Sequence, residues 1–152
     1  MAKFITFLTL PSQEKIFFCK ALGLQIYFRL LLFNQPFKKI IYKASRLKQH
    51  NLNRRIDPTI TPVKACQLTH IAANLTPFAT CFSRSLAGSI ALASLGLEST
   101  IHIGVLKNRT QPFSAHAWLI YDDKLITGFL PNLKEFTPLP SPFDKMSNEP
   151  HR

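Results

Sequence analysis

The sequence predicts an α+β fold in which helices pack on a small antiparallel sheet. Two observations favour this class. Long apolar segments of helical length occupy the chain up to residue 95, and short segments with alternating apolar residues follow them. A run of helices followed by strands is typical of α+β domains, in which tight turns connect the strands. With 152 residues, 46% hydrophobic and 18% charged, the chain is apolar enough to bury one core.

Two helices are expected in the N-terminal third. The first covers residues 12–33, a strongly apolar segment. Pro36 then starts a second helix at 37–48, with its basic side chains largely on one face. We do not expect the first helix to span a membrane, because Lys20 and Arg29 would place charge inside the bilayer.

Two more helices and three strands are expected in the rest of the chain. Thr80 is placed to cap the second of these helices, and Gly96 suits its C-terminal end. The helices are expected at 63–75 and 81–95, and the strands at 100–106, 115–121 and 124–127. Asp122 and Asp123 form the turn between the last two strands.

Positive charge is concentrated at the N-terminal end. Residues 1–56 contain eleven Lys and Arg and one acidic residue, whereas residues 57–152 contain eight and seven. The predicted domains are therefore a basic helical N-terminal arm at 1–56, a core at 57–140 and a flexible tail at 141–152. A basic field attracts acidic peptides, anionic lipid headgroups or nucleic acid. Nucleic acid is not an expected partner, because no recognised binding motif accompanies the charge.

Three widely spaced cysteines, Cys19, Cys66 and Cys81, do not suggest a disulfide framework. We therefore expect a reducing, cytoplasmic compartment. The apolar and basic helices leave open a peripheral contact between residues 14–55 and the inner face of a membrane.

Cys81 is the first candidate catalytic residue, because it lies in the first turn of a predicted helix. Free N–H groups and the positive end of the helix dipole favour the thiolate there, and the thiolate is the nucleophilic form of cysteine. The N–H groups of Cys81 and Phe82 are also placed to face a developing oxyanion. Taken alone, a single cysteine is more often a small core residue.

His116 is the second candidate, as the base that accepts the thiol proton. It lies within a predicted strand, with Trp118 pointing in the same direction. A histidine fixed on a sheet and facing a helix N-terminus has the geometry of a Cys–His pair. Taken alone, a strand histidine more often serves packing.

Other candidates are weaker. Cys66 and His70 are four residues apart on a predicted helix, a spacing that can bind metal, but no second pair at metal spacing accompanies them. We expect neither a metal nor a cofactor. His102 is expected to point away from the apolar motif of its strand and to serve packing or the surface.

Three motifs occur in order along the chain: CFSRSLA from Cys81, IGV from Ile103 and FSAHAWL from Phe113. Together they resemble the lasso-peptide maturation proteases, a transglutaminase-like family that includes the C-terminal domain of the microcin-processing protein. The resemblance covers roughly residues 62–139.

The resemblance implies a papain/transglutaminase-like core and a cysteine peptidase that removes the leader from a ribosomally made lasso-type precursor peptide. Cys81 and His116 match the catalytic pair of the family. The implied partners are the precursor, a separate leader-recognition protein and a separate ATP-dependent lasso cyclase.

The chain departs from the family at one position. The carboxylate that orients the histidine typically follows it by about a dozen residues, and Gly128 occupies that place here. Asn132 or another group is left as the third member, or none at all. Two other functions stay open: acyl transfer from a thioester through the same pair, and an inactive adaptor that binds peptide or membrane.

Overall fold

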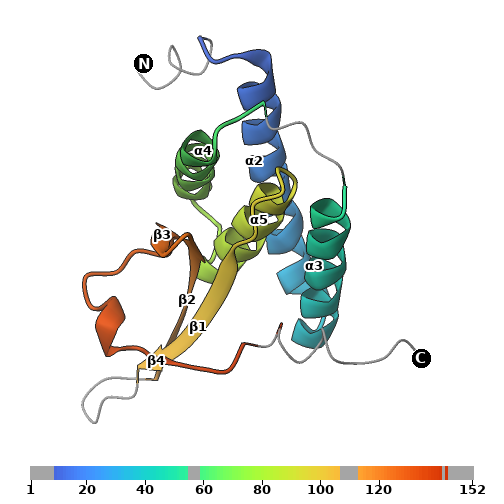
Figure 1. Cartoon of the computed structure of the whole chain (residues 1–152). Coiled ribbons are helices and arrows are strands. Elements are labelled where there is room, and N and C mark those ends of the chain that lie inside the picture. The colour runs from blue at the N-terminus through green and yellow to red at the C-terminus, as the bar shows by residue number, and fades with distance from the viewer. Residues whose placement is uncertain (1–8, 55–58, 107–112, 142, 144–152) are drawn as a thin grey trace.

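The computed structural model describes residues 9–54, 59–106, 113–141 and 143, and it confirms the α+β fold (Figure 1). Within these residues, four helices come first, and four strands and one short 3-10 helix follow. The helices are α2 (Ser12–Asn34), α3 (Phe37–Leu52), α4 (Pro62–Leu75) and α5 (Cys81–Ala93). The remaining elements are β1 (Thr100–Leu106), β2 (Ser114–Tyr121), β3 (Lys124–Thr127), η1 (Leu133–Glu135) and β4 (Thr137–Pro138).

Helix α5 lies at the centre of the fold, between the sheet and helices α2 and α3 (Figure 1). Small residues let it pack closely on both sides. A Cβ added to Gly88 would lie 2.8 Å from Cδ2 of Leu119 on β2 and 3.0 Å from Cγ2 of Thr69 on α4. This contact sets α5 against the strand that carries His116.

Helices α2 and α3 contribute side chains to the same core as α5. Phe17 and Phe28 of α2 and Ile40 of α3 are buried in one hydrophobic cluster with Leu86 and Ile90 of α5. The two helices expected as an arm are thus packed into the domain. The division of the chain at residue 56 stays a prediction.

Within the described residues, α2 is the one helix long and apolar enough to cross a membrane by length and composition. Only one side of α2 packs against the core of the domain. Phe17, Phe28 and the polar Gln25 are buried inside the domain, while much of the opposite side is exposed.

The sheet has the strand order β3-β2-β1-β4 and is antiparallel throughout. In its centre His102 is opposite Trp118, and Gly104 is opposite His116. Asp122 and Asp123 form the expected turn, and both have positive φ, 50° and 57°. Such angles suit the tight hairpin turns that join two twisted strands.

The sequence did not predict β4. It pairs Thr137 and Pro138 with Val105 and Gly104 of β1, and the N–H of Leu139 donates to the carbonyl of Ile103 at 2.8 Å. Two further residues at the start of the predicted tail, Ser141 and Phe143, line a cavity of about 130 Å³. The rest of that tail, residue 142 and residues 144–152, lies outside the described residues.

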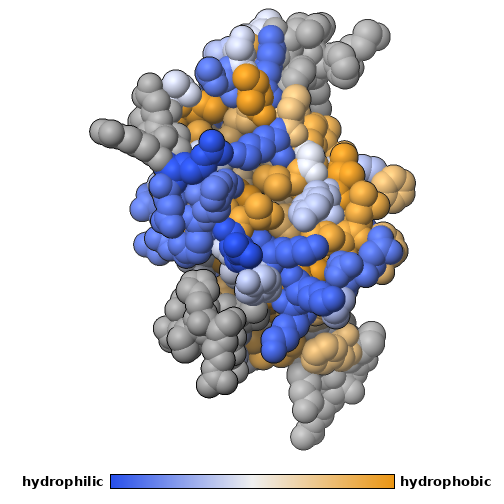
Figure 2. Space-filling model, turned by 90° about the vertical axis from the view of Figure 1, so that its right-hand side faces the viewer, coloured by the Kyte–Doolittle hydropathy of each residue, from blue (hydrophilic) through white to orange (hydrophobic). Residues whose placement is uncertain are grey.

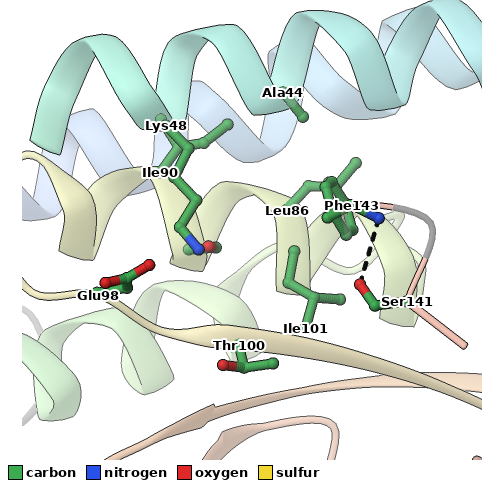
Figure 3. A pocket seen from close by; sticks show the side chains of 10 residues that line it. Ala44, Lys48, Leu86, Ile90, Glu98, Thr100, Ile101, Ser141 and Phe143 are labelled. Carbon is green, nitrogen blue, oxygen red and sulfur yellow. Dashed lines mark hydrogen bonds between the residues drawn. The ribbon is translucent and has the colours of Figure 1, made fainter. Parts of the chain in front are cut away.

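That cavity lies between α3, α5 and β1 (Figure 3). Lys48 and Glu98 flank one end, and Ser141 and Phe143 line the other. The ammonium of Lys48 donates to the carbonyl of Ser99 at 2.6 Å. The cavity contains neither Cys81 nor His116 and is set apart from the candidate catalytic pair.

Candidate active site

The N-terminus of α5 is capped in a way that fixes Cys81 at the first helical position. The hydroxyl oxygen of Thr80 accepts the N–H of Ser83 at 3.2 Å. The hydroxyl of Ser83 donates back to the carbonyl of Thr80 at 3.0 Å. Because a helix leaves its first N–H groups without intrahelical acceptors, those of Cys81 and Phe82 can bind an incoming oxyanion.

Arg84 ties this turn to the loop before it. Its Nη2 donates to the carbonyl of Thr76 at 3.3 Å. The motif arginine therefore holds the α4–α5 connection in place and brings a positive charge to the helix end that carries Cys81. The Cys81 side chain is half-buried, so a substrate carbonyl has a route to its sulfur.

His116 is held by a backbone carbonyl. Its Nε2 lies 2.8 Å from the carbonyl oxygen of Gly128. Because that oxygen can only accept, Nε2 carries the proton, and Nδ1 of the neutral ring keeps a lone pair. Gly128 occupies the place where the family's carboxylate is expected, so a main-chain oxygen supplies the acceptor that a side chain would otherwise supply.

Gly128 is required where it stands. Its φ is +86°, in the region that side-chain-bearing residues rarely adopt. An added Cβ would lie 2.6 Å from the carbonyl oxygen of Ala117 and 2.8 Å from Cα of Trp118. The chain therefore crosses β2 closely at this point, and that approach brings the Gly128 carbonyl to His116.

Aromatic rings surround the His116 imidazole. Its centroid lies 6.3 Å from the indole of Trp118 and 5.7 Å from the ring of Phe136. His102 stacks on Trp118 at 5.7 Å. His102 thus lies on the same face as His116 and points away from Ile103 and Val105, as expected, because successive residues of a strand point to opposite faces.

Gly104 of the IGV motif makes room for this row of rings. An added Cβ there would lie 2.8 Å from Cη2 of Trp118 and 3.1 Å from Cβ of Phe136. The glycine lets the indole lie across β1, beside His116. The motif signal in the sequence is therefore explained by packing beside the site.

The structure does not place the two candidate catalytic residues, Cys81 and His116, in hydrogen-bond contact. Leu119 faces α5, so by strand alternation His116 and Trp118 project from the other face of β2. Among the described residues no hydrogen bond links Cys81 to His116. Strand β3 ends at Thr127, opposite Leu119, so β2 has no strand neighbour on that side at His116.

Cys66 and His70, the other thiol and imidazole considered, have surroundings that suit a structural role and not a catalytic one. Burial raises the pKa of the Cys66 thiol, and Asp122 adds to this effect while Lys124 opposes it. Cys66 is thus poorly suited to act as a thiolate. His70 donates from Nδ1 to the carbonyl of Ile126 at 2.9 Å, and its Nε2 accepts from Asn74 at 3.0 Å. Both ring nitrogens are occupied within the protein.

Cys66 and His70 also line an open groove of about 580 Å³ between α4 and β3. Asp122 and Lys124 form its hairpin side. Neither Cys81 nor His116 lines this groove.

Asp122→Asn and Asp123→Asn are each expected to change kcat/KM by less than tenfold, about 1.4 kcal/mol of barrier. Both are turn residues, and asparagine tolerates positive φ. The Nε2 of His116 already has its acceptor in Gly128. Steady-state kcat/KM checks this, and a thousandfold loss in either variant would make that aspartate the histidine's partner.

The comparisons with known proteins agree with the fold. Residues 23–141 match the family model described as the transglutaminase-like superfamily. No curated protein and no solved structure matches. The matched segment runs from within α2 to three residues past β4, so it includes Cys81, His116 and Gly128. Members of this superfamily are usually cysteine peptidases or acyl transferases. The chain belongs to the transglutaminase-like superfamily.

Proposed function

We propose that the protein is a cysteine peptidase that removes the leader from a ribosomally synthesised lasso-type precursor peptide. The observation that carries the proposal is the placement of Cys81 at the capped N-terminus of α5, within a matched superfamily segment that also contains His116. The three motifs resembling lasso-peptide maturation proteases support the substrate class.

In the proposed reaction the Cys81 thiol gives its proton to Nδ1 of His116, and the resulting thiolate attacks the scissile carbonyl carbon. The N–H groups of Cys81 and Phe82 bind the new oxyanion. Collapse breaks the peptide bond, and the imidazolium returns the proton to the leaving amine. Water, deprotonated by His116, then hydrolyses the thioester and releases the leader carboxylate.

Gly128 is a positioning residue in this scheme. Its carbonyl holds the Nε2–H tautomer, so that Nδ1 is the nitrogen available as base. A neutral carbonyl stabilises the imidazolium less than a carboxylate does, so the pair should work more slowly than a full Cys/His/Asp triad.

The partners expected from the resemblance belong to the same proposal. A separate leader-recognition protein delivers the precursor, and a separate lasso cyclase uses the product. The cytoplasm is the proposed compartment.

One observation favours a second candidate, an inactive adaptor that binds peptide. Among the described residues, His116 and Cys81 are not hydrogen-bonded to each other, and no carboxylate is hydrogen-bonded to the imidazole. Acyl transfer to an amine would use the same two residues and differs only in the acceptor of the acyl group.

The test incubates the protein with a lasso-type precursor peptide and a separate leader-recognition protein, with and without hydroxylamine. We expect two fragments whose masses add up to the precursor plus one water. A leader fragment that carries the amine in preference to water would indicate a transferase. An intact precursor at all times would favour the adaptor.

A further inference from the structure

One side of α2 presents apolar side chains to the surface. Its residues follow one another in steps of three and four, which places them on one stripe of the helix. This α2 stripe consists of Ile16 (62% exposed), Cys19, Gly23, Ile26 (55%), Leu30 (57%) and Phe33 (69%). A Cβ added to Gly23 would meet nothing within 4 Å, so the stripe is open at its centre.

The stripe is long and continuous. Ile16 and Phe33 are seventeen positions apart, which corresponds to about 25 Å along a helix axis. Two more aromatic residues of these helices are exposed, Tyr27 of α2 (42%) and Phe37 at the start of α3 (51%). Contiguous apolar surface of this size on a folded domain marks an interaction site.

Positive charge borders this apolar surface. Residues 15–54 contain nine Lys and Arg and no Asp or Glu. Glu14, just before them, is paired with Lys64 at 3.4 Å. Within α3 the exposed basic side chains are Lys38, Lys39, Lys43 and Arg46. Figure 2 shows hydrophobic and strongly hydrophilic surface adjoining one another on the same face.

A cation also lies directly over the stripe. The guanidinium carbon of Arg29 is 4.3 Å from the centre of the Phe33 ring. An arginine stacked on an exposed aromatic ring presents both an apolar surface and a charge at the same place. Aromatic and basic residues together are typical of side chains at the boundary between headgroups and acyl chains.

We infer that this surface binds the headgroup region of a bilayer that contains anionic lipids. The helix lies in the plane of the interface, with the α2 stripe toward the acyl chains and the basic residues of α3 on the phosphates. The other side of α2 holds Phe28 and Gln25 in the core, so the helix docks without leaving the fold.

Two features favour a bilayer over a protein. First, no α2 residue lines either of the two cavities described above. A second copy of the chain would bring two basic surfaces together, because residues 15–54 offer no acidic group for pairing. The inference does not rest on the peptidase proposal, since vesicle binding needs no catalysis.

The experiment measures binding of the full chain to vesicles by sedimentation at 0.1 M salt. One vesicle type is phosphatidylcholine alone, and the other contains about a third phosphatidylglycerol. We expect binding to the anionic vesicles to be at least a hundredfold tighter. Raising the salt should weaken it, because the charges are exposed.

Paired variants separate the two contributions. Lys39→Glu with Lys43→Glu should weaken anionic binding about 600-fold, at about fivefold for each of the four units of charge changed. Ile26→Ser with Leu30→Ser should weaken it at least tenfold by removing apolar surface. The matched controls are Lys124→Glu with Lys134→Glu, and Val63→Ser with Ile71→Ser, which are exposed on other elements and should bind as the wild type does.

Equal binding to both vesicle types, or to neither, would overturn the inference. So would control variants that lose as much affinity as the test variants. Sedimentation of the protein without vesicles also measures its oligomeric state. A dimer that Ile26→Ser with Leu30→Ser dissociates would assign the stripe to a second copy instead.

Discussion

Replacing Cys81 with alanine is expected to abolish cleavage of the precursor peptide, with a loss in kcat/KM of about 10⁴-fold or more. The reason is that no other described thiol stands at a capped helix N-terminus. The fold should persist, since removing one small group from a half-buried site costs on the order of 1 kcal/mol of unfolding free energy. Thermal unfolding and the product assay measure the two effects.

The matched controls for this change are the other two cysteines. Cys19→Ala, on the exposed side of α2, and Cys66→Ala, in the α4–β3 groove, should both keep activity. If Cys66→Ala is inactive while Cys81→Ala cleaves, the nucleophile has been assigned to the wrong helix.

The same assay tests whether Cys81 and His116 act as a pair. When a nucleophile and its base act as a unit, removing both costs no more kcat/KM than removing either one. The double variant should therefore be no slower than either single variant. A double variant that is far slower than both would show that the two residues contribute independently. That outcome would agree with their separation in the structure.

Gly128→Ala is expected to lower kcat about a hundredfold, which corresponds to about 2.7 kcal/mol of barrier. The new Cβ would overlap the carbonyl oxygen of Ala117 and the Cα of Trp118, so the loop must move and take its own carbonyl away from His116. The imidazole then loses the acceptor that selects its tautomer.

Gly96→Ala is the matched control. Gly96 also has positive φ, +72°, but an added Cβ meets nothing within 4 Å. It shares the backbone strain, about 1–2 kcal/mol, without the overlap. If activity falls equally in Gly128→Ala and Gly96→Ala, then Gly128 contributes to the stability of the fold and not to the positioning of His116.

A spectroscopic readout separates positioning from stability. Nitrogen-15 shifts of the ring should show His116 as the Nε2–H tautomer in the wild type and as a mixture in Gly128→Ala. If the wild type already shows Nδ1–H, the carbonyl of Gly128 does not orient the base.

The helices and the central strands follow directly from sequence pattern. Thr80 caps α5 as expected, and the alternating residues of β1 and β2 form the pair that the sequence predicts. These features depend on local propensity and periodicity, which a sequence displays. The α2 stripe was not recognised, because a helix that is apolar all round hides which side faces the core.

The acceptor of His116 could not be predicted for a different reason. A backbone carbonyl belongs to every residue, so no side chain marks the one that matters. The one signal available was a glycine at the place of the family's carboxylate, and its meaning depends on the positive φ and the close approach to Ala117. Strand β4 was missed because it is two residues long and contains Pro138.

Trapping of the acyl-enzyme tests the central claim most directly. The protein is mixed with precursor and recognition protein, quenched in acid and digested with trypsin. Peptide 65–84 contains both Cys66 and Cys81, so its fragment ions distinguish the two thiols within one molecule. We predict a leader-derived thioester on Cys81 that disappears as free leader accumulates. Leader release without any adduct on Cys81, or with the adduct on Cys66, would contradict the account.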